Sequence, residues 1–402
     1  MATLHPDFIA MLKKDYPQEA EQMLAAIATE PSVAVRLNRR KPTDAPLGAT
    51  AVEWSKGGYR LAERPRFTFD PLLHAGCYYV QDPSSMFIAE VIRQSHLTSP
   101  ISYLDLCAAP GGKTTAAIDA LPEGSLVVAN EIDGRRAQIL CENVIKWGYP
   151  AVVVTNSDAR KLGKLKEAFD VVAADMPCSG EGMMRKDEEA VEQWTPKLVE
   201  QCAARQQEIA DDIWKALKPG GLFIYSTCTF NRFEDEENAR FACQLMGGEL
   251  LEERHFLPGR DRGEGFYVAA IRKPVQPDSF NEALADVFAE ARPSHIATTE
   301  QEAQEQLTRV KSLVHRFLRI LYDAEKTYAS AEHLPQVPLS YDEALQYLRR
   351  EAVRVEAPRG MVTLCHRGFP LGHGKCVGNR INNLYPMEWR IRSGYTTPFT
   401  LF

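Results

Sequence analysis

Between residues 101 and 228 the sequence alternates short apolar runs with segments of helical periodicity, and this pattern restricts the fold most. The apolar runs are YLDLC (103–107), SLVVANE (125–131), AVVVTN (151–156), DVVAAD (170–175) and GLFIYSTC (221–228). Helical patterns lie near 113–121, 134–147, 160–168 and 197–217, and GEGFYVAAIRK (263–273) predicts one more strand. Continuous apolar strands that alternate with helices predict a parallel sheet covered on both faces, so we expect a doubly wound, Rossmann-like α/β domain.

The composition fits a soluble globular protein, with 402 residues, 45% hydrophobic and 25% charged. Collagen-like, low-complexity and disordered classes are excluded. The nine cysteines are odd in number and contain no C-x-x-C pair, which predicts free thiols in a reducing compartment. No run approaches the length of a membrane span, and the amphipathic N-terminal segment lacks the features of a signal peptide. We therefore expect a cytoplasmic protein with no membrane partner.

Shorter regions flank the α/β domain, and we expect four in all: 1–95, 96–273, 274–334 and 335–402. The first contains a helical stretch over 1–30, a β-rich run VAVRLNRRK (33–41) and a helix capped by Ser84 or Ser85. Residues 274–334 predict a polar linker followed by a long helix over 304–329. The last region predicts a helix from Tyr341 and then three short strands, in GMVTLCHRG, LGHGKCVGNR and WRIR.

The net charge of −7 argues weakly against a nucleic-acid partner, but its distribution argues for one. Residues 36–66 hold eight basic residues against three acidic ones, and residues 359–392 hold six against one. Tyr385, Trp389 and His373 stand among the second group and offer surfaces on which bases can stack. The alternative is an ordinary solvated face.

A glycine-containing turn, LDLCAAPGGKTT (104–115), links the first strand of the α/β domain to its first helix. Gly111 and Gly112 leave room for a ligand to approach the backbone at a helix N-terminus. A phosphate-binding P-loop needs glycine where this chain has Cys107, and the dinucleotide pattern G-x-G-x-x-G is absent. A nucleoside-type ligand remains, with Glu131 placed for the ribose hydroxyls and Asp158 for an adenine amino group. The alternative is a turn whose glycines serve packing alone.

Two cysteines and a carboxylate follow the next strands, in ADMPCSGEG (174–182) and YSTCTFN (225–231). Ligands of open α/β sheets bind at the carboxyl ends of the strands, so Asp175, Cys178 and Cys228 are expected to converge there. A thiolate that adds to carbon 6 of a pyrimidine makes carbon 5 nucleophilic toward an activated methyl group. The Asp175 carboxyl is placed to bind ring N3 and the amino group. Each cysteine is alternatively an inert core thiol, and the residues alone do not order the two roles.

The signatures LDLCAAPGGKT, ADMPCSGEG and YSTCTFNRFEDEENA resemble those of the Nol/Nop/Sun family of RNA (cytosine-5) methyltransferases. QDPSSM (81–86) and GEGFYVA (263–269) also look like family elements. The layout is most similar to the bacterial branch that acts on the small ribosomal subunit. One departure is the segment 274–335, which is mostly helical in pattern and short for the intermediate region of that branch.

The resemblance implies S-adenosylmethionine as cofactor, Cys228 as the nucleophile, and Cys178 as the residue that assists product release. It implies catalytic contributions from Asp175 and Lys113 near the target base. The cofactor-binding residues it implies are Cys107, Ala108, Ala109, Pro110, Gly111, Gly112, Lys113, Glu131, Asp158 and Asp175.

The resemblance also implies RNA-binding roles for the two basic regions, with a PUA-like module at the C-terminus. The basic residues expected to contact RNA are Arg36, Arg39, Arg40, Lys375, Arg380, Arg390 and Arg392. The expected function is methylation of carbon 5 of a cytidine in 16S rRNA by a monomer that recognises the RNA or the 30S subunit. The alternatives are a tRNA methyltransferase and a nucleotide-dependent RNA-binding protein without transferase activity.

Two smaller features complete the sequence analysis. Cys365, His366, His373 and Cys376 match no standard zinc spacing, so no metal is expected. The acidic run FEDEENA (233–239) is expected to stabilise a helix N-terminus rather than to act chemically.

Overall fold

A computed structural model describes residues 3–275, 300–328, 334–394, 399 and 401–402. The chain divides into two compact units. The first comprises Met1–Ser32, Asp82–Leu140 and Ala151–Tyr322, and the second comprises Val33–Gln81, Cys141–Pro150 and Asp323–Phe402. These units follow contacts rather than chain order, and the four consecutive regions expected from the sequence stay predictions.

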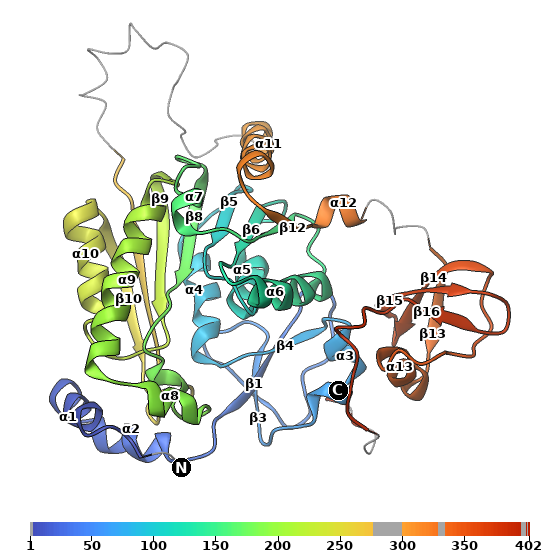
Figure 1. Cartoon of the computed structure of the whole chain (residues 1–402), viewed down its shortest axis with the longest axis horizontal. Helices are drawn as coiled ribbons and strands as arrows, with labels where there is room; N and C mark the ends of the chain where they lie inside the picture. Colours follow the sequence, from blue (N-terminus) through green and yellow to red (C-terminus); the bar gives the residue numbers. More distant parts are fainter. Residues whose placement is uncertain (1–2, 276–299, 329–333, 395–398, 400) are drawn as a thin grey trace, which may run out of the picture. The chain divides into compact units, whose positions relative to one another are not determined.

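An eight-stranded sheet forms the centre of the first unit, in the order β10-β11-β9-β8-β5-β6-β7-β12 (Figure 1). Its strands are β5 (Ser102–Asp105), β6 (Leu126–Asn130), β7 (Val152–Thr155), β8 (Phe169–Asp175), β9 (Leu217–Thr227), β10 (Glu249–Phe256), β11 (Phe266–Arg272) and β12 (Ile320–Asp323). Strands β7, β6, β5, β8 and β9 are parallel, whereas β11 and β10 add antiparallel pairs at one edge. The parallel strands are buried along most of their length, which is why their sequences are continuously apolar.

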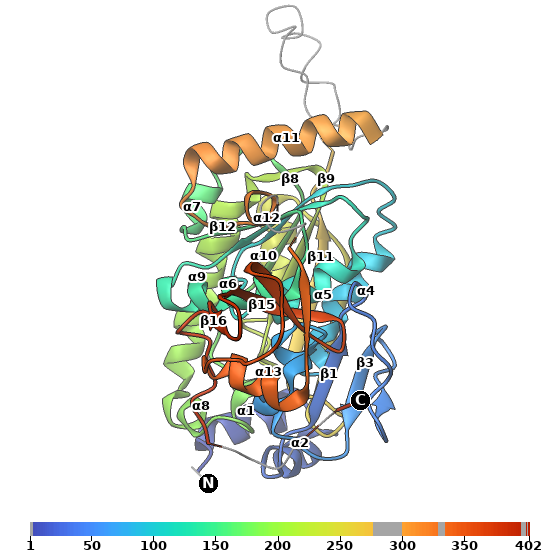
Figure 2. The same cartoon turned by 90° about the vertical axis from the view of Figure 1, so that its right-hand side faces the viewer.

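Helices cover both faces of this sheet, with α9 and α10 on one face and α4, α5 and α6 on the other (Figures 1 and 2). Their bounds are α4 (Ile88–Gln94), α5 (Gly112–Ala120), α6 (Gly134–Trp147), α7 (Ala159–Leu162), α8 (Glu188–Gln193), α9 (Pro196–Trp214), α10 (Glu236–Met246) and α11 (Glu300–Phe317), with 3-10 turns η2 (Ser84–Phe87) and η3 (Glu181–Met183). Helix α11 packs Leu307, Val310 and Val314 into the same core as Phe169, on β8. The predicted doubly wound architecture is therefore confirmed.

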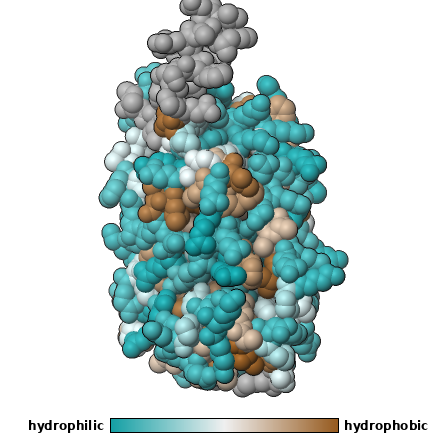
Figure 3. All heavy atoms as spheres, turned by 90° about the vertical axis from the view of Figure 1, so that its left-hand side faces the viewer, coloured by the Kyte–Doolittle hydropathy of each residue, from teal (hydrophilic) through white to brown (hydrophobic). Residues whose placement is uncertain are grey.

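Two N-terminal helices, α1 (Pro6–Asp15) and α2 (Ala20–Ile27), form a smaller core of the first unit. Phe8 and Met23 from these helices pack with Trp194 and Phe230. Phe230 lies only two residues after Cys228, so this core supports one of the predicted site loops. On the face drawn in Figure 3, hydrophilic side chains dominate and apolar ones form separate small patches.

Two four-stranded sheets build the second unit. One has the order β2-β3-β1-β4, with all pairs antiparallel, and the other has the order β13-β14-β15-β16, with β13 parallel to β14. The bounds are β1 (Val33–Leu37), β2 (Thr50–Ala51), β3 (Gly58–Leu61), β4 (Tyr78–Val80), β13 (Gln336–Leu339), β14 (Gly360–His366), β15 (Phe369–Cys376) and β16 (Ile381–Asn383), with helices η1 (Phe67–Phe69), α3 (Pro71–His74), α12 (Ala324–Tyr328) and α13 (Tyr341–Leu348). Val35 and Tyr78 share one apolar core with Leu345 and Val362, so both sheets stabilise each other.

Three local predictions were wrong. The helix expected over 304–329 ends at Phe317, and ILYD then forms strand β12. This strand pairs with β7 at the edge of the sheet, and hydrophobic periodicity within the segment does not reveal such a pairing. WRIR (389–392) is not a strand, and β16 is formed by INN instead. Neither Ser84 nor Ser85 caps α4, since Ser84 Oγ donates to the Glu264 carbonyl (2.9 Å). Residues 276–299 of the predicted linker lie outside the described residues.

Among the described residues, no helix is long and apolar enough to cross a membrane. In the same residues, no group of three or more His, Cys, Asp or Glu side chains is arranged to hold a metal ion.

Candidate active site

The glycine-containing turn lies between the carboxyl end of β5 and the first turn of α5. The Leu106 N–H donates to the Ala173 carbonyl (2.8 Å) and the Ala108 N–H to the Asn130 carbonyl (2.8 Å), which ties the turn to two neighbouring strands. Gly111 has a φ of 112°, in the left-handed region that favours glycine, and caps α5. The sequence Cys107–Gly112 thus forms the predicted turn at a helix N-terminus, and its binding of a cofactor stays a prediction.

Glu131, the residue after β6, has a buried carboxyl oxygen. Its Oε1 accepts from the Asp133 N–H (2.9 Å), whereas its Oε2 is buried and accepts no hydrogen bond among the described residues. Arg136 Nη1 lies 3.6 Å from Oε2, and Arg136 Nη2 donates to the Ala109 carbonyl (2.9 Å). A buried acceptor without a donor costs free energy, and a ribose hydroxyl supplies that donor. The residues present therefore fit a nucleoside cofactor.

Asp158 follows β7 and caps the short helix α7, where its Oδ1 accepts from the Lys161 N–H (2.7 Å). Its side chain is half-buried, at the same carboxyl edge of the sheet as Glu131. The structure thus brings both acidic residues predicted for the cofactor to one edge.

Asp105, the last residue of β5, is a site residue that the sequence analysis did not single out. It is buried, and its Oδ2 accepts from Thr114 Oγ1 (2.6 Å). Burial raises the pKa of its carboxyl to about 7, with the negative charges of Asp175 and Glu131 adding to the shift. A buried carboxyl with a raised pKa beside this turn is a candidate for a functional position. The only available signal was the position of Asp105 at a strand end.

Lys113 and Asp175 form a close ion pair, with 2.8 Å between Nζ and Oδ2. Ser226 Oγ donates to the other Asp175 oxygen (3.0 Å), and Phe266 places its ring 5.3 Å from the Lys113 ammonium. Burial alone would lower the pKa of Lys113, but the Asp175 carboxylate, with smaller contributions from Cys228 and Asp105, raises it, so the ammonium is held charged. Both partners stay partly accessible, which leaves them available to a substrate.

The two predicted cysteines meet. Cys178 lies in the loop after β8, Cys228 follows β9, and their Sγ atoms are 3.0 Å apart. Both are half-buried free thiols. The hydrogen bond with Cys228 and burial raise the pKa of the Cys178 thiol well above its ordinary value. The Cys178 thiol is therefore held in its protonated form.

Two consecutive carboxyls, Glu234 and Asp235, hold the loops that carry these cysteines. Glu234 accepts from the Ser179 N–H (3.0 Å) and from the Ser179 hydroxyl, next to Cys178. Asp235 accepts from the hydroxyls of Thr227 (2.6 Å) and Thr229 (2.9 Å), which flank Cys228. Both carboxyls are completely buried. The acidic run expected to serve a helix N-terminus thus fixes the distance between the two cysteines.

More buried polar side chains complete this network. Gln206 donates to Glu234 (2.7 Å) and to the Pro177 carbonyl (3.0 Å). Asn231 donates to both Glu234 and Glu181 (2.9 Å each), and Glu181 also accepts from Trp194 Nε1 (3.0 Å). Burial raises the pKa of Glu181 to about 7. Both carboxyl oxygens of Glu181 and of Glu234 have hydrogen-bond partners, and a buried network of this kind favours one arrangement of the loops.

The basic residues predicted to bind RNA lie in the second unit. Arg39 and Arg40 are exposed, as are Lys375, Arg380, Arg390 and Arg392. Arg36 differs, because it is 1% exposed, stacks 4.6 Å from the Trp147 ring centre and donates to Gln81 (2.9 Å). Its charge is enclosed by its own unit, so we correct the prediction and leave Arg36 out of the RNA-binding surface.

Comparison with known proteins identifies the fold and then the family. A methyltransferase homologue and NSun6, both from Pyrococcus horikoshii, match with TM-scores of 0.55 and 0.58 at 22% and 19% identity, each over 67% of this chain and over 100% and 98% of its own. These likenesses show that the chain has the fold of a Rossmann-like methyltransferase.

Three family models match successive parts of the chain: the N-terminal domain of 16S rRNA methyltransferase RsmF over residues 4–83, 16S rRNA methyltransferase RsmB/F over 97–272, and the methyltransferase RsmF PUA domain over 335–391. Ribosomal RNA small subunit methyltransferase F of Aliivibrio fischeri (strain MJ11) is 30% identical, over 78% of this chain and 79% of the relative. The Shewanella loihica protein of the same name is 27% identical over 96% of each chain.

The chain belongs to the 16S rRNA methyltransferase RsmB/F family. The predicted family, fold, cofactor and activity as an rRNA methyltransferase are thereby confirmed, and RNA is its substrate. The alternative of an RNA-binding protein without transferase activity is wrong.

Proposed function

We propose that this methyltransferase modifies carbon 5 of a cytidine in 16S rRNA through a covalent adduct with Cys228. The observation that supports this most is the pair of thiols 3.0 Å apart, beside the Lys113–Asp175 ion pair. Methyl transfer to an oxygen or an exocyclic nitrogen needs no thiol, whereas carbon 5 becomes nucleophilic only after addition at carbon 6.

The cofactor supplies an electrophilic methyl group when it is bound. Residues Cys107–Lys113 would hold it from the β5–α5 turn, Glu131 would accept the ribose hydroxyls at its buried Oε2, and Asp158 would receive the adenine amino group. Asp175 is proposed to border this site as well. Gly111 and Gly112 leave the approach to the backbone open.

Cys228 is the proposed nucleophile. Its sulfur forms a bond to carbon 6, and the electron pair of the 5,6 double bond becomes available at carbon 5, which then takes the methyl group. Cys178 is assigned the second role because its hydrogen bond with Cys228 and its burial raise the pKa of its own thiol. This assignment follows the roles that the family resemblance implies.

Cys178 is the proposed aid to product release. Removal of the carbon 5 proton restores the double bond and expels the Cys228 thiolate. A thiol 3.0 Å from that sulfur is placed to donate a hydrogen bond to the departing thiolate. Asp175 would bind N3 and the amino group of the base, and the Lys113 ammonium holds that carboxylate in place and balances negative charge in the adduct.

The deciding experiment compares substrates. Purified protein is given S-adenosylmethionine and, in parallel, naked 16S rRNA, 30S subunits and bulk tRNA, and bisulfite sequencing maps the products. A single new 5-methylcytidine in 16S rRNA supports the proposal. A product confined to tRNA would favour the tRNA alternative. We also propose that the enzyme is a monomer in the cytoplasm. Light scattering after gel filtration measures its mass in solution and so tests the monomer.

A further inference from the structure

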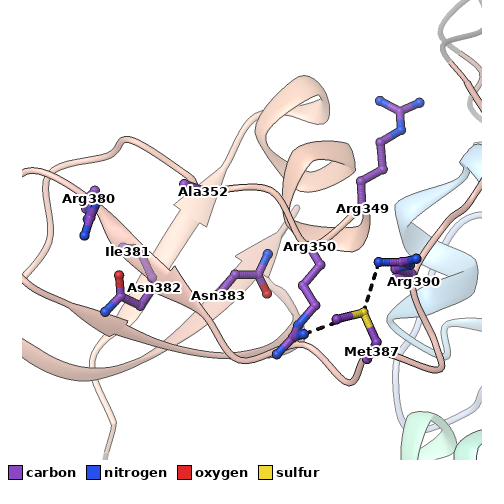
Figure 4. Close-up of a pocket in the computed structure, with 9 residues that line it drawn as sticks. All are labelled: Arg349, Arg350, Ala352, Arg380, Ile381, Asn382, Asn383, Met387 and Arg390. Atoms are coloured by element: carbon purple, nitrogen blue, oxygen red, sulfur yellow. Dashed lines mark hydrogen bonds between the residues drawn. The ribbon is translucent and has the colours of Figure 1, made fainter.

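Residues 3–32 lie in the first unit with the methyltransferase sheet, although the rest of the N-terminal region does not. Strands β1–β4 belong to the second unit, together with Arg380 and Arg390, which line a cavity there and are expected to bind RNA (Figure 4). Helices α1 and α2 instead pack beside α8 (Figure 1). Their contacts are therefore with the loops of the methyltransferase domain.

Tyr16, the residue after α1, reaches the loop that carries Cys228. Its hydroxyl donates a hydrogen bond to the Phe230 carbonyl (2.7 Å), which is 214 residues away along the chain and only two residues after Cys228. Phe230 is completely buried, and no other donor to its carbonyl is found in the described part of the chain. Because a buried carbonyl without a donor costs free energy, the Tyr16 hydroxyl holds this carbonyl in one place.

Phe230 also links the two loops that carry the cysteines. Its N–H donates to Glu181 Oε2 (2.9 Å), on the loop after β8. In the opposite direction, the Gly182 N–H of that loop donates to the Cys228 carbonyl (2.7 Å). The two loops are thus bonded to each other, and Tyr16 ties the pair to α1 through the Phe230 carbonyl.

The Tyr16 side chain is itself held by its surroundings. Its hydroxyl lies 3.5 Å from His255 Nδ1 on β10, and the two rings meet edge-on with 6.2 Å between their centres. His255 Nε2 lies 3.0 Å from a Glu236 oxygen, which fixes the imidazole ring. Burial raises the pKa of Tyr16 well above its usual value, with Asp235 and Glu236 adding to the shift. The phenol therefore keeps its proton and remains a donor.

We infer that Tyr16 is a positioning residue for methyl transfer, which acts through the Phe230 carbonyl on the loop of the nucleophile Cys228. The Cys228 sulfur has to come within bonding distance of carbon 6, and a misplacement of about 1 Å at a reacting atom can cost ~100-fold in rate. The inference rests on the proposed function for the role of Cys228. It assigns α1 to catalysis rather than to RNA binding.

The test uses the full chain with Tyr16→Phe, which removes the hydroxyl and keeps the ring beside His255. The matched control is Gln22→Leu, because Gln22 on α2 donates a similar long-range hydrogen bond to the Gly259 carbonyl (2.9 Å), outside both cysteine loops. Methyl transfer is measured on the RNA that the wild type methylates best. The kcat is expressed per S-adenosylmethionine site counted by calorimetry, so unfolded protein does not lower it.

We expect Tyr16→Phe to lower kcat about tenfold, while KM for RNA and for S-adenosylmethionine changes by less than about twofold. Gln22→Leu should keep the wild-type kcat and KM. An unchanged kcat in Tyr16→Phe, or an equal loss in Gln22→Leu, would overturn the inference. So would a raised KM for RNA at unchanged kcat, because α1 would then serve RNA binding.

Adduct formation reports on Cys228 more directly. Tyr16→Phe combined with Cys178→Ala should form the protein–RNA adduct about tenfold more slowly than Cys178→Ala alone, and equal rates would contradict the inference. The variant Cys228→Ala separates this inference from the proposed function. If Cys228→Ala still transfers methyl groups, the proposed function fails. If Cys228→Ala is inactive and Tyr16→Phe has the wild-type kcat, only the role of Tyr16 fails.

Discussion

The Glu234 carboxyl accepts both the backbone N–H and the hydroxyl of Ser179, so it holds the residue next to Cys178 at two points. Gln206 and Asn231 supply two further donors, so every hydrogen bond found at the Glu234 side chain in the described part of the chain is one that a carboxylate accepts. Its neighbour Asp235 does the same for the residues around Cys228. The spacing of the two thiols is therefore set by one short segment of the chain.

Glu234→Gln should lower kcat by about 10- to 100-fold, because an amide turns a donor toward groups that already donate and the Cys178 loop shifts. The free energy of unfolding should fall by about 1–3 kcal/mol for the same reason. Steady-state kinetics and urea unfolding measure both. The control is Glu237→Gln, an exposed change three residues further on, in the first turn of α10. An unchanged kcat in Glu234→Gln would show that the hydrogen bonds between Glu234 and Ser179 have no catalytic consequence.

Cys228→Ala should abolish methyl transfer, since no other group supplies the bond to carbon 6. Cys178→Ala should instead accumulate a protein–RNA adduct that survives a denaturing gel, because release of the Cys228 thiolate loses its nearby thiol. Cys202→Ala removes a half-buried thiol elsewhere in the first unit and should behave like the wild type. An adduct in Cys228→Ala, and none in Cys178→Ala, would reverse the two roles.

Glu131→Gln should weaken S-adenosylmethionine binding by about tenfold, because an amide offers the ribose hydroxyls one acceptor in place of two carboxylate oxygens. Isothermal titration calorimetry without RNA gives the affinity directly. Exposed Glu123 lies in the turn before β6, and Glu123→Gln should bind normally. Equal affinities for wild type and Glu131→Gln would remove Glu131 from the cofactor site.

Gly182→Ala should destabilise the site by about 2–3 kcal/mol and nearly abolish activity. A Cβ atom at residue 182 would collide with the Gly265 carbonyl oxygen and would lie 2.9 Å from the Cys228 carbonyl oxygen. The Cys228 carbonyl accepts a hydrogen bond from the Gly182 N–H (2.7 Å), so neither carbonyl can move away freely. Thermal unfolding and methylation assays report both effects. A Cβ at Gly134 meets no atom within 4 Å, so Gly134→Ala should be tolerated.

Stability should fall as pH rises from about 4.5 to about 7, in part because of Glu181. Burial holds this carboxyl protonated in the folded state up to about pH 7, whereas the unfolded chain releases the proton near 4.5. The folded state is thus fully favoured by this group below that window and loses up to about 3 kcal/mol across it. Urea titrations at several pH values should show a smaller loss in Glu181→Gln than in wild type. Exposed Glu192→Gln should retain the wild-type profile.

The sequence predicts the sheet well because buried parallel strands are apolar along their whole length, as in LVVAN of β6 and VVVT of β7. It places Cys178 and Cys228 together because both follow neighbouring parallel strands. It does not reveal that Glu234, Asp235 and Arg36 are buried, since charged residues ordinarily face water. Glu234 and Arg36 are buried with partners remote in the chain, Ser179 and Gln81, whereas Asp235 binds the nearby Thr227 and Thr229. Strand β12 is not predicted either, because its four residues continue the apparent helical periodicity of the segment before them.

The second unit is assembled from three separated segments, and Val35 and Tyr78 near the N-terminus share their core with Leu345 and Val362 near the C-terminus. During synthesis the N-terminal sheet of this unit (β1–β4) leaves the ribosome early. Part of its apolar face stays uncovered until the C-terminal sheet (β13–β16) has also been synthesised. Nascent β1–β4 is thus the segment most exposed to misassembly or chaperone capture. A stop codon before residue 335 would leave that face permanently uncovered, even though every strand of the methyltransferase sheet had been made.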